Sequence, residues 1–376
     1  MLQPSQKLVS RLSLAVVAVA IVTAISYLEA RQPGRVSVQP IDQAVIGSAD
    51  AKPATTAQLA KEIVAPAGFI NTAGQPITIQ QFIGTKVVLV DFWTYSCINC
   101  QRTLPYVTAW YEKYKDQGLE VIGIHTPEFD FEKDIHNVQK AVDQWQITYP
   151  VVLDNDYGTW QNYKNLYWPR KYLIDISGAI VYDHIGEGGY AETEKKIQAL
   201  LTDRLKKLGL AGTISSDLVN PTKVEVPSTA GPLSPETYFG SARNTFLANG
   251  TYNASGVQDF IVPTGSPKEN LAYLSGRWDI SPEFATNLVA GAKIIYKFNA
   301  AKVFLVASAA ENTKLTLLLD GKPVTNSAGS DVVNSQAEIK DDTLYRLIEN
   351  ATGYGQHTLE IIITQPGVKI FTLTFG

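Results

Sequence analysis

Between residues 66 and 210, short runs of β-branched residues alternate with longer stretches whose apolar positions repeat at helical spacing. The most apolar run is 87–93, which predicts a strand covered on both faces. After it, apolar residues recur at the spacing of one helix face; these are Leu104, Val107, Tyr111 and Tyr114. The pattern predicts a buried strand, a short polar break and a helix.

The same reading extends in both directions from this unit. Strands are predicted over 119–125, 151–153, 171–176 and 179–185, and helices over 131–145 and 192–208. A short hairpin is predicted over 66–82, where Asn71 to Gly74 supply turn residues. Because strands and helices alternate, residues 66–210 are expected to form one α/β domain.

Beyond residue 210 the pattern changes class. Residues 211–232 are rich in Ser, Thr, Pro and Gly and are expected to form a linker. Short β-rich runs follow at 302–307, 315–319, 344–349, 358–364 and 368–375, and Asp320-Gly321 is a hairpin signal between two of them. Residues 233–376 are therefore predicted to form an antiparallel all-β sandwich.

The N-terminus carries an export pattern. Lys7 and Arg11 precede an uncharged apolar run over 12–28. Leu28-Glu29-Ala30 fits a cleavage site poorly, which favours a retained single-pass membrane anchor over 1–30 rather than a cleaved signal peptide. Residues 31–65 lack a period and are expected to form a flexible linker that separates the folded part from the membrane.

Composition narrows the range of partners. The chain has 32 Lys and Arg against 36 Asp and Glu, and no basic block, which argues against a nucleic-acid partner. Its two cysteines are Cys97 and Cys100, so a second disulfide within the chain is excluded. This low cysteine usage fits a location outside the cytoplasm.

Cys97 and Cys100 open the predicted helix after strand 87–93. A helix N-terminus favours a thiolate at Cys97, while Cys100 is expected to point inward. Disulfide exchange needs this asymmetry, because one thiolate attacks a partner disulfide and a second thiol resolves the mixed disulfide. Asp91 lies in the apolar strand, where burial would raise its pKa and let it accept the Cys100 proton. A solvated Asp91 at a strand end is the alternative.

A metal site is the other common use of a Cys-x-x-Cys pair. Structural zinc needs four ligands, and no histidine of the chain has ligand-like spacing to the pair. We therefore expect no metal and no cofactor other than a redox-active Cys97–Cys100 disulfide.

The segment from Val88 to Cys100, with Pro105 five residues later, resembles thioredoxin. Tyr149 to Asp154 and the extra helix between strands resemble the TlpA-like, membrane-associated branch. Residues 92–102 together with 125–129 look like the C-terminal extracytoplasmic region of DipZ proteins, in which a carbohydrate-binding-module-like, jelly-roll β-sandwich follows the thioredoxin-like domain. Residues 234–240 resemble the start of that second domain.

The resemblance implies roles for single residues. Cys97 matches the nucleophile, Cys100 the resolving thiol and Asp91 the buried proton acceptor. Pro169 matches a cis-proline facing the disulfide, with Trp168 beside it at a substrate-binding position; an ordinary strand-entry turn is the alternative. Trp93 is the second residue implied in substrate binding. Cytochrome c biogenesis and antioxidant defence are the processes that the resemblance suggests.

Two features depart from the family pattern. The multi-helix membrane part of DipZ proteins has no counterpart among the apolar runs, so electrons are expected from a separate membrane donor of the DsbD or CcdA type. Thr103 stands where reductive TlpA-like proteins often carry Glu. Glu128 could substitute for that acid, but a solvated surface position is the expectation for it.

The sequence thus favours an extracytoplasmic, membrane-tethered thiol:disulfide oxidoreductase, a reductase by resemblance, acting on protein disulfides and thiols. One alternative is a cell-surface protein that binds a glycan or another protein, with the β-sandwich as the binding part and the thioredoxin-like domain as a redox-inert scaffold. A sugar-stacking face would then be drawn from Tyr252, Tyr273, Trp278, Tyr296, Tyr345 and Tyr354, although such aromatics are more often core. A thiol peroxidase is the third possibility, and the Cys-x-x-Cys pair disfavours it.

Overall fold

The computed structural model describes residues 58–376 except 223, 228–229 and 351–352. The predicted anchor over 1–30 and most of the linker over 31–65 lie outside the described residues. Of the helices in the described part, none is both long and apolar enough to cross a membrane. The described residues belong to one compact unit.

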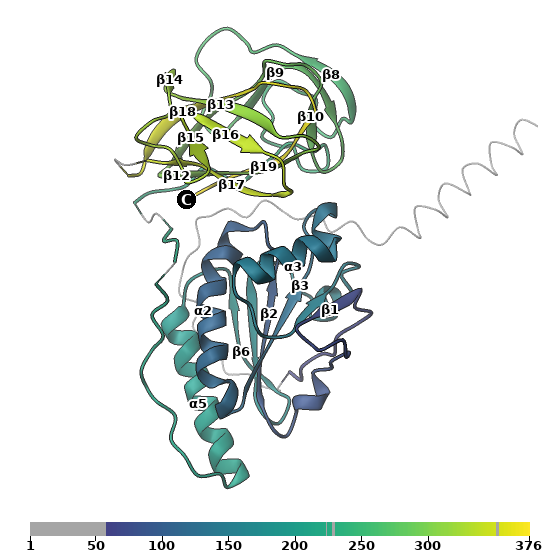
Figure 1. Cartoon of the computed structure of the whole chain (residues 1–376), viewed down its shortest axis with the longest axis vertical. Helices are drawn as coiled ribbons and strands as arrows, with labels where there is room; N and C mark the ends of the chain where they lie inside the picture. The colour runs from purple at the N-terminus through teal and green to yellow at the C-terminus, as the bar shows by residue number, and fades with distance from the viewer. Residues whose placement is uncertain (1–57, 223, 228–229, 351–352) are drawn as a thin grey trace, which may run out of the picture. The chain divides into compact units, whose positions relative to one another are not determined.

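Residues 68–208 form an α/β domain (Figure 1). Its strands are β1 (Gly68–Ile70), β2 (Val87–Trp93), β3 (Leu119–His125), β4 (Val151–Leu153), β5 (Arg170–Ile174) and β6 (Ile180–Ile185). Its α-helices are α2 (Ile98–Tyr114), α3 (Ile135–Gln144), α4 (Gly158–Asn162) and α5 (Tyr190–Leu208). Three short 3-10 helices are η1 (Gln80–Phe82), η2 (Lys115–Gln117) and η3 (Asp130–Lys133).

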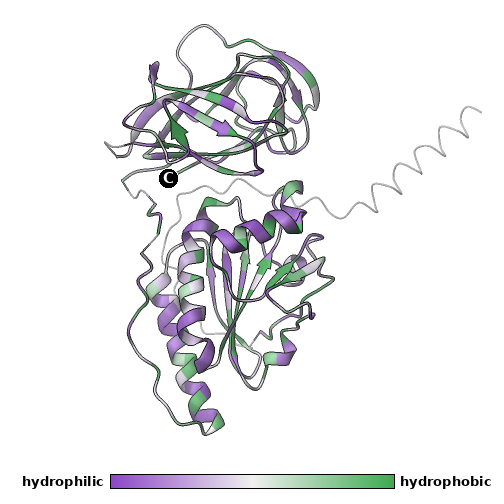
Figure 2. Cartoon of the chain, viewed as in Figure 1, coloured by the Kyte–Doolittle hydropathy of each residue, from purple (hydrophilic) through white to green (hydrophobic). Residues whose placement is uncertain are grey.

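The six strands pair in the order β1-β4-β3-β2-β5-β6. The two central strands, β2 and β3, run parallel and are buried along their whole length. They are buried because one sheet face packs against α2, α3 and α5 and the other against α4 and the segment before β2. Figure 2 shows hydrophilic and hydrophobic residues mixed along α3 and α5, as expected of helices with one face on a sheet.

The hairpin predicted over 66–82 is wrong. Gly68–Ile70 forms a single strand, β1, that pairs antiparallel with β4 across the sheet edge. The chain after it contains only the η1 turn before β2. A partner from β4 is available at the edge, so the segment pairs with it rather than with its own continuation.

Residues 237–375 form an antiparallel β domain. Its first seven strands are β7 (Thr237–Tyr238), β8 (Gly256–Phe260), β9 (Ala272–Ile280), β10 (Ala285–Asn287), β11 (Ala292–Ala300), β12 (Lys302–Ala309) and β13 (Thr313–Leu319). The last six are β14 (Lys322–Pro323), β15 (Val332–Val333), β16 (Gln336–Ile339), β17 (Thr343–Glu349), β18 (Gly355–Ile363) and β19 (Val368–Phe375).

All thirteen strands join one hydrogen-bonded network. The predicted Asp320-Gly321 hairpin is confirmed: β13 pairs with β14, and both turn residues have positive φ. The alternating burial of β11, in which every second residue is buried, shows one face on a core and one toward solvent. The core of the β domain is a single cluster of buried side chains, to which strands β8 to β13 and β15 to β19 contribute.

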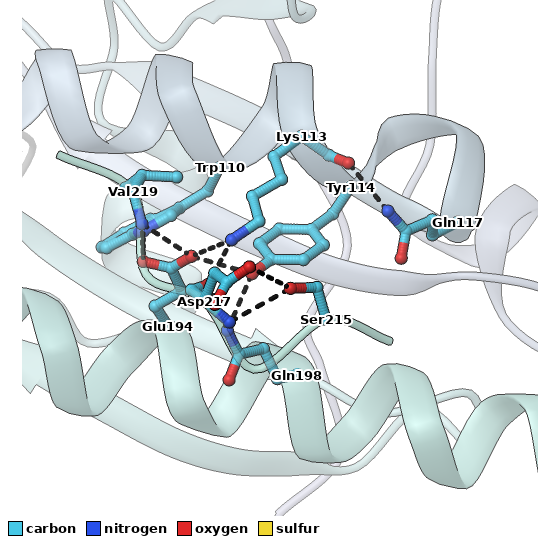
Figure 3. Close-up of polar contacts among 9 residues, drawn as sticks. All are labelled: Trp110, Lys113, Tyr114, Gln117, Glu194, Gln198, Ser215, Asp217 and Val219. Carbon is cyan, nitrogen blue, oxygen red and sulfur yellow. Dashed lines mark hydrogen bonds and ion pairs between the residues drawn. The ribbon is translucent and has the colours of Figure 1, made fainter. Parts of the chain in front are cut away.

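The segment after α5 lies against the α/β domain (Figure 3). The buried Glu194 carboxylate accepts hydrogen bonds from Trp110 Nε1 at 3.2 Å, Tyr114 OH at 2.7 Å and the backbone N–H of Val219 at 2.9 Å. Lys113 forms an ion pair with the same carboxylate at 3.1 Å. The first part of the predicted linker is therefore docked on α2 and α5.

Candidate active site

Cys97 is the N-cap of α2. Its backbone is extended, and its sulfur accepts a hydrogen bond from the Cys100 N–H at 3.4 Å. Both cysteines are free, and Cys97 is partly exposed. A sulfur at this position meets the positive end of the helix dipole and the unpaired N–H groups of the first turn.

Cys100 lies one turn further on and is fully buried. Burial raises the pKa of the Cys100 thiol well above its usual value, with the nearby Cys97 and Asp91 adding to the shift. The pair therefore consists of one accessible sulfur and one shielded sulfur that stays protonated until a base takes its proton.

Asp91 is fully buried in the middle of β2. Burial raises the pKa of Asp91 to about 7, and the positive charge of Lys171 partly offsets the rise. Neither carboxylate oxygen has a hydrogen-bond partner among the described residues. Asp91 is thus a buried acid that titrates near neutrality beside a buried thiol.

Lys171 was not anticipated from the sequence. It faces Asp91 across the β2–β5 pairing, is fully buried, and its Nζ donates to the Gly186 carbonyl at 3.1 Å. Burial lowers the pKa of Lys171, and Asp91 works against that shift. A lysine inside an otherwise apolar strand was the available signal.

The Trp168-Pro169 peptide bond is cis and directly precedes β5. Pro169 is buried, whereas Trp168 is partly exposed. The Trp168 indole N–H donates to the Thr126 carbonyl at 3.1 Å, and its ring packs on Trp160 at 4.2 Å between centroids. The roles of Pro169 and Trp168 toward a substrate stay predictions.

The predicted contact of Trp93 with substrate needs correction. Trp93 is fully buried, and its ring meets the edge of the His125 imidazole at 4.9 Å. His125 in turn stacks on Tyr95, and burial lowers the pKa of His125 to about 3, so this imidazole is neutral. Trp93 packs in the core because it ends a strand that is covered on both faces.

Glu128 is not the solvated surface residue that we expected. Its carboxylate accepts hydrogen bonds from the Tyr238 hydroxyl at 2.8 Å and from Arg243 at 2.7 Å. Nearby Glu132 is fully buried and accepts hydrogen bonds from the Ser96 hydroxyl at 2.7 Å and the Ser96 N–H at 3.2 Å. The segment between β3 and α3 thus contacts both the turn before Cys97 and the β domain.

The start of α2 also contacts the β domain. Gln101 accepts a hydrogen bond from Arg346 of β17 at 2.6 Å, and the buried Arg102 pairs at 3.3 Å with Glu225 of the segment that precedes the β domain. Ile98 shares one apolar cluster with residues of β12, β17 and β19. Sequence periodicity carries no signal for this interface, because its residues are far apart in the chain.

The proposed sugar-stacking aromatics separate into two groups. Trp278, Tyr273, Tyr296 and Tyr345 are buried in the β domain, and only Tyr252 is strongly exposed, at 62 %, with Tyr354 half-buried. The four buried rings are core residues. Among the described residues no group of three or more His, Cys, Asp or Glu side chains is placed to hold a metal ion.

Two family models match the chain. Residues 53–183 match the AhpC/TSA family, and residues 234–376 match the model described as "Thioredoxin like C-terminal domain". A solved thioredoxin-like protein in its oxidised form is 27 % identical, with a TM-score of 0.36, and the match covers 39 % of this chain and 97 % of that one.

Curated relatives match over both short and long regions. Protein DipZ of Mycobacterium bovis is 38 % identical over 313 residues, which is 82 % of this chain and 41 % of that protein, so the chain spans about two fifths of that relative. The thiol-disulfide oxidoreductase YkuV of Bacillus subtilis is 30 % identical over 34 % of this chain and 85 % of its own length. The α/β fold, the Cys-x-x-Cys pair at the start of α2 and the curated relatives all agree, so the chain belongs to the thioredoxin-like thiol-disulfide oxidoreductases.

Proposed function

We propose that this protein reduces disulfides of protein substrates through Cys97 and Cys100. The observation that carries the proposal is the asymmetry of the pair: a partly exposed sulfur caps α2 and a fully buried sulfur lies beside the buried Asp91. A surface-exposed pair or a structural disulfide would not need a buried acid at this place.

The reaction follows from the positions of these groups. The Cys97 thiolate attacks one sulfur of the substrate disulfide, and the first substrate thiolate leaves. Asp91 then takes the Cys100 proton, and the Cys100 thiolate attacks Cys97, which releases the second substrate thiolate. Two electrons reach the substrate, and a Cys97–Cys100 disulfide remains.

Turnover in this direction requires a dithiol that reduces Cys97–Cys100 again. The proposed source is a separate membrane protein of the DsbD or CcdA type, as the resemblance to DipZ proteins suggests. The opposite direction, oxidation of substrate thiols, is distinguished by the equilibrium of the pair with glutathione, since a strongly reducing pair favours the disulfide form.

Insulin reduction tests the activity directly. The wild-type chain should precipitate insulin with dithiothreitol as donor, Cys97→Ser should abolish the acceleration, and Cys100→Ser should stop at a mixed disulfide. Retained rate in the double variant would refute the proposal. Hydrogen peroxide consumption, measured in parallel, covers the peroxidase alternative, for which we expect no more than background.

Location and the second domain are finer parts of the proposal. We infer an anchor over 1–30 in the bacterial cell membrane, a thioredoxin-like domain over 66–210 and a carbohydrate-binding-module-like sandwich over 233–376. Fractionation of cells that express the full chain should recover it with membranes, and removal of residues 1–30 should release it. A glycan array probed with the full chain examines a sugar ligand.

A further inference from the structure

Glu132 is a buried carboxylate that takes no part in the exchange reaction described above. One of its oxygens accepts hydrogen bonds from the Ser96 hydroxyl at 2.7 Å and from the Ser96 N–H at 3.2 Å. The other accepts from the backbone N–H groups of Glu128 at 2.6 Å and Phe129 at 3.0 Å. The side chain therefore joins the turn directly before Cys97 to the segment that follows β3.

The far side of that segment contacts the β domain. Glu128 accepts hydrogen bonds from Arg243 at 2.7 Å and from Tyr238 at 2.8 Å, and the Arg243 guanidinium lies over the Tyr238 ring at 3.7 Å. Phe129 and Phe131 pack on Phe371 at 5.0 and 4.8 Å between ring centroids. A continuous path of contacts thus runs from Arg243 through Glu128 and Glu132 to Ser96.

We propose that Glu132 is a positioning residue that fixes the turn carrying Cys97, and that Arg243 of the β domain holds the same segment through Glu128. The inference rests on the proposed function and gives the β domain a part in it. A fully buried carboxylate is costly to desolvate, and three of the four groups that donate hydrogen bonds to Glu132 are backbone N–H groups.

The measurable consequence is the thiol–disulfide equilibrium of the pair. In that equilibrium the dithiol and oxidised glutathione give the Cys97–Cys100 disulfide and two reduced glutathiones. A fixed turn keeps the two sulfurs within bonding reach and favours the disulfide. Loss of Glu132 loosens that turn and therefore shifts the equilibrium toward the dithiol.

Glu132→Gln tests the positioning role of Glu132, because a glutamine amide can accept hydrogen bonds at its oxygen but not at its nitrogen. The expected result is a shift of the glutathione equilibrium constant toward the dithiol by about tenfold, the factor that one charge-assisted hydrogen bond is worth. Ser96→Ala, which keeps the carboxylate, should shift it in the same direction by a smaller factor and guards against a misfolded Glu132→Gln. If both variants fold and keep the wild-type constant, the positioning role is wrong.

Glu120→Gln is the matched control. Glu120 is also a buried carboxylate of this domain, paired with Lys86 at 2.6 Å, but it lies at the opposite end of β3 from His125. The Glu120→Gln variant should have a lower free energy of unfolding than the wild type but the same glutathione equilibrium constant. An equal shift in Glu120→Gln would show that general destabilisation moves the constant and would overturn the inference.

Arg243→Met tests the part played by the β domain, with Lys293→Met, which breaks the ion pair to Glu360 within that domain, as its control. Arg243→Met should shift the constant toward the dithiol and Lys293→Met should not. An unchanged constant in Arg243→Met refutes the link to the β domain. The glutathione equilibrium is measured without a protein substrate. A failure of insulin reduction would therefore refute the proposed function, while the glutathione measurement would still test the positioning role of Glu132 and Arg243.

Discussion

The Asp91 carboxylate has no hydrogen-bond partner among the described residues, and the positive charge of the equally buried Lys171 partly offsets the rise of its pKa. As the proposed base for Cys100, it must be ionised to act. We predict that Asp91→Asn lowers the turnover rate with insulin about hundredfold, a typical contribution of one general base. Mass spectrometry of quenched reactions should show a mixed disulfide at Cys97. A wild-type rate without that intermediate would exclude Asp91 as the base.

Asp91 also makes stability depend on pH. The pKa of Asp91 is about 7 in the folded chain and 3.8 in the reference state, so between these values the folded protein binds the proton more tightly. The stability that protonated Asp91 contributes to the folded state is fully present below pH 4 and is lost as pH rises through 7. A shift of this size is worth about 4 kcal/mol. Urea unfolding at pH 5 and 8 should show a larger loss in the wild type than in Asp91→Asn.

The sequence located the residues that carry chemistry because they lie together in the chain. Cys97, Cys100 and Asp91 all belong to one strand and the helix after it, and a carboxylate in an apolar run is visible without a fold. Lys171 and Glu132 were not found. Their importance depends on strand pairing and on a loop folding back, which periodicity does not report.

At the scale of elements, Glu194 connects α5, α2 and the segment after α5 (Figure 3). We predict that Glu194→Gln lowers the free energy of unfolding by about 1–3 kcal/mol, since buried donors lose their charged acceptor. Limited proteolysis should then cut residues 211–222 faster. Glu192→Gln changes an exposed residue of the same helix and should leave both measurements near wild type.

Element types were predicted better than element limits. The strands 119–125 and 151–153 are found as expected. The helix predicted over 131–145 is instead η3 followed by α3, because Asp134 caps α3 by accepting the His136 N–H at 2.8 Å. An N-cap residue inside an apolar period was the missed signal. Strands β8 to β11 were missed, since polar residues interrupt their apolar positions.

At the scale of the whole molecule, Phe371 belongs to an apolar cluster that includes Ile98 of α2 and Phe129. We predict that Phe371→Ala costs about 3–5 kcal/mol of unfolding free energy. It should also speed amide hydrogen exchange in 127–133, because the partner of that segment is lost. Phe298→Ala, buried in the β-domain core alone, should cost as much without changing exchange there. Equal exchange in both variants would contradict the coupling.

The contacts between the two folded regions were beyond sequence reading altogether. Gln101 and Arg346 are separated by 245 positions, and nothing in either segment marks the other as its partner. The composition shift near residue 211 indicated where one pattern ends, but the docking of that segment on Glu194 follows only from the packed helices.

Helix α2, which follows Cys97 and carries Cys100, cannot be exchanged with the helix of another protein on its own. Gln101 and Arg102, the two residues after Cys100, have their side chains engaged by Arg346 and Glu225. If α2 were replaced by the corresponding helix of another thioredoxin-like protein, the two sulfurs would be kept but Gln101 and Arg102 would be lost. Arg346 would then lose its amide acceptor and Glu225 one cationic partner, although Arg346 and Lys302 would still pair with Glu225. Useful redesign therefore has to exchange both surfaces together.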